Sequence, residues 1–125
     1  MTKIADFLNK NDRFAADAGC RILEMEEGRA VAEMTVTPHH LNGGGVCQGG
    51  ALFTLADLAL AAVMNSRGQL TFGIENNIMF MASARVGTAC RSPRGGRPSE
   101  DSNRRSPYYE SEWTTLVCGD RCGLS

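Results

Sequence analysis

The sequence has almost no net charge, no disulfide pattern and no apolar run of about 20 residues that could cross a membrane. Its 125 residues, enough for one small domain, carry 13 basic and 14 acidic side chains. This balance gives no electrostatic case for a nucleic-acid or membrane partner. The five cysteines are an odd number without framework spacing, which is typical of reduced thiols. Residues 1–10 lack the apolar stretch of a signal peptide, so we expect a cytoplasmic protein.

A glycine-rich loop over residues 41–50 runs directly into an apolar segment over residues 51–64. Within that segment only Thr54 and Asp57 are polar. Because a helix that is apolar on nearly every side is a buried one, we expect a long buried helix over about residues 49–66. Burying a lone carboxylate costs several kcal/mol unless it is paired or neutralised. Asp57 is therefore expected to be buried, and either held by partners from elsewhere or kept for chemistry.

The start of this helix has the features of an anion site. Gly49 and Gly50 leave backbone N–H groups free at the helix N-terminus, where the helix dipole favours negative charge. The segment is not a phosphate loop, because no Gly-Lys-Ser/Thr follows the glycines. An oxyanion site together with a carboxylate such as Asp57 is the apparatus of acyl transfer to water.

Four short motifs follow one another here: Leu41-Asn42-Gly43, Gln48-Gly49-Gly50, Leu52-Phe53-Thr54-Leu55-Ala56-Asp57 and Asn65-Ser66. This series resembles the signature of hotdog-fold acyl-CoA thioesterases of the phenylacetate-degradation type (4-hydroxybenzoyl-CoA thioesterase superfamily). The resemblance covers about residues 4–87. In that family the second motif is His-Gly-Gly, so Gln48 replaces a histidine. Glutamine can donate a hydrogen bond but cannot carry charge.

The resemblance implies an α+β hotdog fold, in which an antiparallel sheet wraps around the long helix. It implies a homodimer or homotetramer with the active site at the subunit interface, where Asp57 of one chain faces Gly49 of another. The reaction implied is hydrolysis of acyl-CoA, with an aryl-acetyl or medium-length acyl group, to the free acid and CoA. No cofactor is expected, because coenzyme A is part of the substrate.

The catalytic residues that the resemblance implies are Asp57, Gly49, Asn42 and Gln48. The Gly49 N–H would hold the oxyanion, and Asp57 would act as general base on water or as nucleophile. Asn42 and Gln48 would orient water or the carbonyl group.

Three further residues are expected to bind substrate, namely Gly50, Thr54 and Phe80. Thr54 lies three residues before Asp57, on the same face of the helix. In the alternative interpretation, its hydroxyl only makes a hydrogen bond to its own helix backbone. Phe80 and Met81 border the acyl pocket in one interpretation and pack in the core in the other.

The remaining apolar patterns predict short elements around the central helix. Residues 3–18 have helical spacing that breaks near Asn11-Asp12. Residues 21–26 and 29–36 predict a hairpin with one solvated face, and residues 70–81 predict a further strand.

No metal site is expected. Cys118 and Cys122 have no zinc-motif spacing that would join them to His39 and His40. The two histidines match no catalytic position of the family and are interpreted as exposed loop residues. Cys47 has no nearby base to complete a nucleophilic dyad, so we expect it only to line the site.

The last third of the chain does not have the composition of the three further strands that a hotdog fold requires. It has six arginines, no lysine and three of the four prolines, and residues 92–107 are typical of disorder. We therefore divide the chain into a thioesterase domain (1–87) and an atypical tail (88–125) that leaves the sheet incomplete. The tail is interpreted either as a reading-frame shift near residues 86–90 or as a genuine flexible tail with a strand over residues 112–118.

Two rival functions are weighed against the thioesterase. A hotdog-fold dehydratase or hydratase needs a histidine beside a carboxylate, and no histidine follows His40. A catalytically degenerate acyl-CoA-binding or interaction protein would explain Gln48 and the tail, whereas Asp57 favours an enzyme. Loss of turnover with retained binding in Asp57→Asn would separate the enzyme from the binding protein.

Overall fold

The computed structural model describes residues 3–80, 82–95, 108–114 and 117–118. Its elements in chain order are α1 (Lys3–Asn11), α2 (Arg13–Asp17), β1 (Arg21–Glu26), β2 (Arg29–Thr35), the 3-10 helix η1 (Pro38–His40), α3 (Gly49–Met64), β3 (Phe72–Ile78), β4 (Ala89–Gly95), β5 (Tyr108–Thr114) and β6 (Val117–Cys118). This order confirms the predicted pair of short N-terminal helices, the hairpin, the long helix and the strand that follows it.

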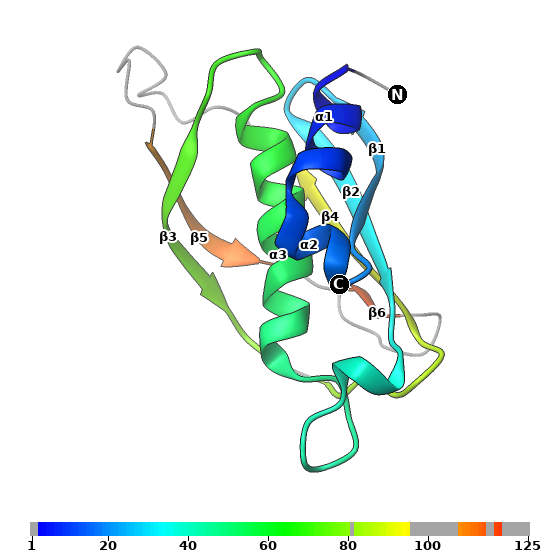
Figure 1. The fold of residues 1–125 in the computed structure, drawn as a ribbon. Helices are drawn as coiled ribbons and strands as arrows, with labels where there is room; N and C mark the ends of the chain where they lie inside the picture. The colour runs from blue at the N-terminus through cyan, green and yellow to red at the C-terminus, as the bar shows by residue number, and fades with distance from the viewer. Residues whose placement is uncertain (1–2, 81, 96–107, 115–116, 119–125) are drawn as a thin grey trace.

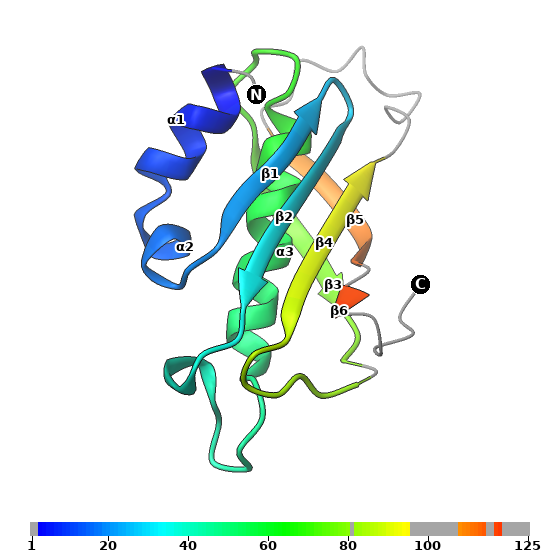
Figure 2. The ribbon, with the colours of Figure 1, turned by 90° about the vertical axis from the view of Figure 1, so that its right-hand side faces the viewer.

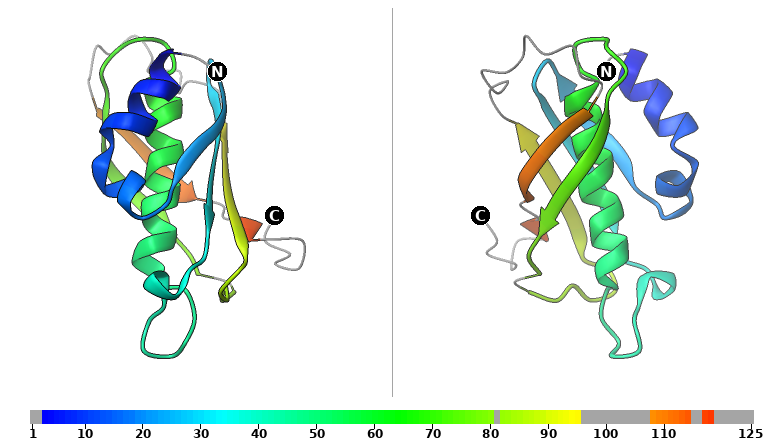
Figure 3. Two further views of the ribbon diagram at one scale, coloured as in Figure 1. Left: turned by 45° about the vertical axis from the view of Figure 1, so that its right-hand side comes forward. Right: turned by 90° about the vertical axis from the view of Figure 1, so that its left-hand side faces the viewer.

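The long helix α3 lies between two sheets. One sheet has four strands in the order β1-β2-β4-β6, and each neighbouring pair is antiparallel. Its strands β1, β2 and β4 cover one side of α3, as Figure 2 shows. On another side α3 meets β3, which pairs in parallel with β5 (Figure 1; Figure 3, right). Helices α1 and α2 lie beside α3 at the β1 end of the sheet (Figure 3, left).

The helix buries an apolar surface against the four-stranded sheet. Its buried residues are Leu52, Leu55, Ala56, Leu58, Ala59, Leu60 and Ala62. Small side chains at three of these positions let the helix approach the strands closely, while the leucines fill the space between the layers. Burial of this surface stabilises the fold by about 25 cal/mol per Å² of apolar area removed from water.

Strand β4 lies in the interior of the sheet, although the composition of its second half is typical of disorder. It pairs with β2 over seven residues, from Arg29↔Gly95 to Thr35↔Ala89. The prediction of disorder is wrong for residues 92–95, because ladder hydrogen bonds use the backbone and do not depend on composition. Pro93 lacks an N–H, but it lies beyond Cys90 and Arg91, the residues that β6 pairs with, at a stretch of β4 where proline is tolerated. Residues 96–107 lie outside the described part of the chain.

Ser92 is buried within β4, and its hydroxyl has no hydrogen-bond partner among the described residues. Because an unsatisfied buried hydroxyl costs free energy, Ser92→Ala is expected to raise the free energy of unfolding by about 1 kcal/mol. Urea denaturation measures this change. Ser66→Ala is the contrasting variant and should lower stability, since the Ser66 hydroxyl accepts from the Gly28 N–H (2.9 Å) and donates to the Val63 carbonyl (2.7 Å). A loss of stability in Ser92→Ala would contradict the prediction.

Candidate functional site

The glycine-rich segment forms an exposed loop that extends from the end of the molecule nearest the start of α3 (Figure 1). Leu41 and Cys47 form an isolated β-bridge at its base, and the Asn42 N–H donates to the Val46 carbonyl (2.8 Å). The Asn42 side-chain oxygen accepts from the N–H groups of Gly44 (2.9 Å) and Val46 (3.3 Å). This oxygen therefore shapes the loop, and only the amide NH₂ of Asn42 is left to contact a substrate.

Helix α3 begins at Gly49, with Gln48 as its N-cap residue. The Gln48 carbonyl accepts from the N–H groups of Ala51 (3.0 Å) and Leu52 (3.3 Å), whereas its side chain makes no capping hydrogen bond. Within the described chain, the N–H groups of Gly49 and Gly50 donate to no backbone carbonyl. The start of α3 therefore has two N–H groups without an acceptor, at the positive end of the helix dipole.

The ring of Phe80 lies against the Gly49 backbone. A Cβ atom at position 49 would come within 2.9 Å of this ring, so the ring packs this closely only on a glycine and would have to move aside for a larger residue. Phe80 is 53% exposed, which places it at the site and not in the core. Together with buried Cys47, these residues border a cavity of about 360 Å³ whose lining is Asn42, Val46, Cys47, Gly49, Leu52, Phe80, Ala82 and Ser83. Met81 lies outside the described residues.

Asp57 lies on the exposed side of α3, so the prediction that it is buried is wrong. Asp57 shares a cavity with residues of α2 and lies within reach of Asn76 on β3, while its neighbours Ala56 and Leu58 are buried. Eight residues separate Asp57 from Gly49, which corresponds to about 12 Å along the helix axis. Within one chain, the carboxylate and the free N–H groups therefore cannot act on the same atom.

Asp57 shares two cavities, of about 550 and 390 Å³, with Asp12. Burial raises the pKa of the Asp57 carboxyl and the negative charge of Asp12 raises this pKa further. The side chain is exposed, but the walls of the cavities remove part of the water around its carboxyl group. Among the described residues that line the two cavities, Asp12 and Asp57 are the only ionisable ones. The Asn76 amide donates weakly to Asp57 Oδ1 (3.4 Å).

Sequence reasoning missed both Asp12 and Asn76. Asp12 is the N-cap residue of α2 and accepts from the Ala15 N–H (3.3 Å), so its local role explains its presence without pointing to Asp57. For Asn76 a signal existed, because three consecutive polar residues (75–77) interrupt the otherwise apolar strand. Only the packing of β3 beside α3 brings Asn76 to the carboxylate.

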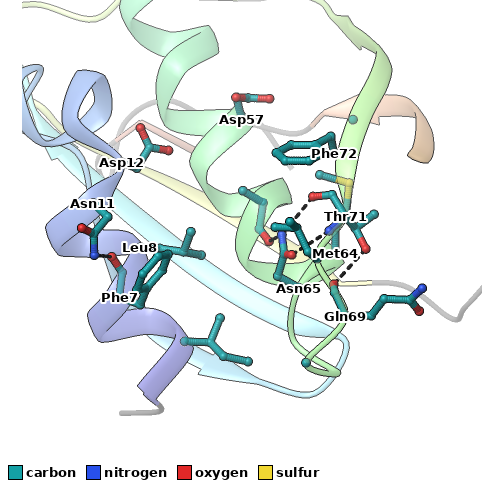
Figure 4. A pocket seen from close by; sticks show the side chains of 15 residues that line it. Phe7, Leu8, Asn11, Asp12, Asp57, Met64, Asn65, Gln69, Thr71 and Phe72 are labelled. Atoms are coloured by element: carbon teal, nitrogen blue, oxygen red, sulfur yellow. Dashed lines mark hydrogen bonds between the residues drawn. The ribbon is translucent and has the colours of Figure 1, made fainter. Parts of the chain in front are cut away.

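The larger cavity lies between α1, α3 and the segment that leads into β3 (Figure 4). Its apolar lining includes Ile4, Phe7, Leu8, Met64, Leu70 and Phe72. Phe7 and Leu8 lie across the cavity from Met64 and Phe72, and Asp12 and Asp57 lie at one end. A mostly apolar cavity of this size with a few convergent polar groups is typical of a small-molecule site.

The Asn65-Ser66 motif has a structural role at the end of α3. Asn65 donates to the carbonyl groups of Ala61 (2.8 Å) and Thr71 (3.1 Å), and its side-chain oxygen accepts from the Thr71 N–H (2.9 Å). Figure 4 shows these bonds beside the larger cavity. Asn65 therefore fixes the turn that delivers Phe72 to the cavity wall.

Thr54 and Gly50 line the smaller cavity with Asp57. The Thr54 hydroxyl donates to the Gly50 carbonyl (2.9 Å), which is the alternative that the sequence left open. The hydroxyl is therefore engaged with its own helix, and its contribution to the cavity is the methyl group. The Gln48 side-chain oxygen lies close to Gly50, where a Cβ atom would come within 3.0 Å of it.

The two histidines differ from each other. His39 is exposed, as predicted, but the prediction is wrong for His40, which is half-buried with both ring nitrogens in hydrogen bonds.

Among the described residues, no group of three His, Cys, Asp or Glu side chains could hold a metal ion. Cys122 and the Cys118 side chain lie outside the described part of the chain. No described helix has the length and apolar character needed to cross a membrane.

Comparison with known proteins relates this loop–helix unit to one family. The model of the family described as "Thioesterase superfamily" matches residues 44–91. The chain is 46% identical over 87 residues to a putative esterase of Archaeoglobus fulgidus, covering 70% of this chain and 56% of that protein. It is 48% identical over 64 residues to the acyl-coenzyme A thioesterase PaaI of Escherichia coli, covering 51% and 46% respectively. The chain thus spans about half the length of the curated relatives it matches.

The fold agrees with a solved structure of the same group. The E. coli PaaI protein from the phenylacetic acid degradation operon superposes with a TM-score of 0.72. The two chains are 35% identical, and the match covers 77% of this chain and 70% of that one.

Proposed function

The chain belongs to the thioesterase superfamily, and we propose that it hydrolyses acyl-CoA thioesters to the free acid and CoA. Membership confirms the predicted α+β hotdog fold, with its antiparallel sheet against α3. The relation to PaaI of E. coli supports the proposed activity. The main observation in favour of this activity is that one helix has both groups that the reaction needs. The Gly49 N–H is free at its start, and the pKa of the Asp57 carboxyl further along it is raised.

In the proposed mechanism, the thioester carbonyl oxygen binds at the Gly49 N–H. Asp57 takes a proton from water as the water oxygen attacks the carbonyl carbon, or attacks this carbon itself to form an anhydride that water then opens. The developing oxyanion is stabilised by the Gly49 N–H and the helix dipole. In the first route the C–S bond then breaks and the CoA sulfur leaves as thiolate. In the second route the same bond breaks as the anhydride forms, before water opens it. Hydrolysis of this kind needs no group besides water, so we propose no cofactor.

The site requires two copies of the chain. Asp57 and Gly49 of one chain are about 12 Å apart along α3, and both border open cavities. We therefore place Asp57 of one protomer opposite Gly49 of the partner subunit in a homodimer, or in a homotetramer built from such dimers. Gln48, exposed beside Gly49, and the free amide of Asn42 are placed to orient the carbonyl or water.

The larger cavity beside Asp57 is proposed to hold the acyl group. Its walls are aromatic and aliphatic, and Phe7 and Phe72 are 63% and 58% exposed without a ligand. Covering these surfaces with an aryl-acetyl or medium-length acyl chain would remove apolar area from water. An acetyl group would leave most of the cavity unfilled.

Release of CoA from a panel of acyl-CoAs by the purified chain tests the proposal. Aryl-acetyl and medium-length acyl-CoAs are expected to turn over with higher kcat/KM than acetyl-CoA. A folded protein that binds these compounds without releasing CoA would overturn the enzymatic proposal and favour an acyl-CoA-binding protein.

The pH dependence of turnover is expected to respond to Asp12. Asp57 must be ionised to act, and the charge of Asp12 helps to raise its pKa. In Asp12→Asn this repulsion is lost, so the Asp57 pKa falls and the acid limb of the kcat/KM profile moves to lower pH. Asparagine also caps helices well, so α2 is retained. Asp6→Asn, an exposed carboxylate of α1 that lines neither cavity, is the control and should leave the profile in place.

A further inference from the structure

The ring of His40 joins three segments of the chain near the start of α3. Its Nδ1 accepts from the Thr37 N–H (2.9 Å), and its Nε2 lies 2.6 Å from the carbonyl oxygen of Ala18, the residue that ends α2. Thr37 and Ala18 are 19 residues apart in sequence. The bonds therefore tie the N-terminal helices to the turn that precedes the glycine-rich loop.

The partners fix the tautomer of this ring. A backbone N–H can only donate, so Nδ1 must be the acceptor, and a carbonyl can only accept, so Nε2 must carry the hydrogen. Both ring nitrogens are satisfied by backbone groups. The orientation of the His40 ring is consequently fixed by two hydrogen bonds, one at each ring nitrogen.

The backbone of the same residue holds the start of α3. The His40 carbonyl accepts from the Gln48 N–H at 2.7 Å. Between these residues the chain makes its exposed glycine-rich excursion, which is closed at its base by the Leu41–Cys47 bridge. Gln48 is the N-cap residue directly before Gly49. A hydrogen-bonded path therefore runs from Ala18 through His40 and Gln48 to the donor proposed to bind the oxyanion.

We propose that His40 is a positioning residue, whose link from α2 to the Gln48 backbone fixes the Gly49 N–H in the direction that the oxyanion requires. The inference rests on the proposed function. Glycines within the excursion (43–45) and directly after it (49 and 50) give the junction little stiffness of its own, so an anchor at its base determines where the donor points. Misplacement by about 1 Å can cost up to 100-fold in rate.

The neighbouring histidine supplies a matched control. His39 is exposed and has no hydrogen bond among the described residues. His40→Ala is expected to lower kcat about tenfold, because an oxyanion contact acts in the transition state, while KM changes less than twofold. His39→Ala is expected to leave both parameters unchanged.

Two conservative variants identify the bond that matters. His40→Gln extends an amide N–H toward the Ala18 carbonyl and should restore most of kcat. His40→Asn offers an acceptor to the Thr37 N–H but does not reach Ala18, so it should resemble His40→Ala. If both variants restored kcat equally, or if neither restored it, the proposed link through α2 would be overturned.

Amide hydrogen exchange provides a measurement independent of activity. The Gln48 N–H should exchange at least tenfold faster in His40→Ala than in the native chain or in His39→Ala, since its bond to the His40 carbonyl opens more often. Unchanged exchange would overturn the anchoring role, and faster exchange with unchanged kcat would overturn the catalytic consequence. If the native chain releases no CoA, the proposed function fails, and the exchange rates still decide whether His40 holds the junction.

Discussion

Asp57→Asn is expected to lower the rate of CoA release about a thousandfold, since a general base contributes roughly 100- to 10,000-fold. Asparagine has nearly the same shape but neither accepts a proton nor attacks a carbonyl at neutral pH. Its amide can still pair with Asn76, so the local hydrogen bond does not require the charge. Single-turnover kinetics with an aryl-acetyl-CoA, together with an equilibrium binding measurement, separate the chemical step from substrate binding.

The same substitution is expected to stabilise the fold at neutral pH. The pKa of Asp57 is raised in the folded chain, first by burial and then by Asp12, so ionising this group disfavours folding above that pKa. Asparagine removes the penalty, and the Tm of Asp57→Asn at pH 7 should exceed that of the native chain. The difference should vanish as the pH falls below the usual Asp value of 3.8, where the carboxyl is protonated in both states. Thermal unfolding at several pH values measures this effect.

Asp17→Asn controls for the loss of one carboxylate near α2. Asp17 is exposed and lines neither of the Asp57 cavities, so this variant should retain native turnover and the native pH profile. Retained turnover in Asp57→Asn would contradict a catalytic role. Loss of substrate binding together with turnover would instead make Asp57 structural.

The parts of the fold that could be predicted are those set by local pattern. The break at Asn11-Asp12, the hairpin turn at Gly28 and the helix start at Gly49 follow from capping, positive φ and periodicity. The positive φ of Gly28 (+77°) is one such local constraint. Strand β4 could not be predicted from its composition, because its partner β2 lies more than fifty residues earlier. The frame-shift and flexible-tail interpretations of residues 88–125 both stay predictions.

The parts of the site that could not be predicted depend on which surfaces the other elements cover. The apolar pattern indicated that α3 is buried, but it could not indicate that the sheet leaves the Asp57 side open in a single chain. His40 looked like an ordinary loop residue because its partner Ala18 is 22 positions away. The sequence did not indicate that Asp12 lies near Asp57, because its role as a helix cap already explained its presence. Tertiary packing decides each of these cases.

Gly49→Pro is expected to lower kcat about 100-fold or more, the usual effect of removing one oxyanion donor. Proline has no N–H, and Gly49 is the first residue of α3, where this N–H has no intrahelical acceptor. The preceding residue, Gln48, already has φ −62° and ψ 139°, an extended conformation that suits a residue before proline. The helix should therefore form normally.

Gly49→Ala is the matched control for this substitution. It adds the same Cβ atom within 2.9 Å of the Phe80 ring but keeps the N–H. The ring is the exposed end of a side chain and can move aside. A loss in Gly49→Ala equal to that in Gly49→Pro would assign the effect to Phe80 and contradict the oxyanion role.

Mixing Gly49→Pro chains with Asp57→Asn chains tests whether the two groups act across an interface. In a mixed dimer, one site pairs the intact Asp57 of one protomer with the intact Gly49 of the partner subunit, and the other site has neither. With random exchange of subunits, half the dimers are mixed and each has one working site, so about a quarter of native activity should return. If both groups acted from the same chain, the mixture would stay as inactive as its parts. The separation of about 12 Å along α3 therefore predicts recovery from two inactive proteins.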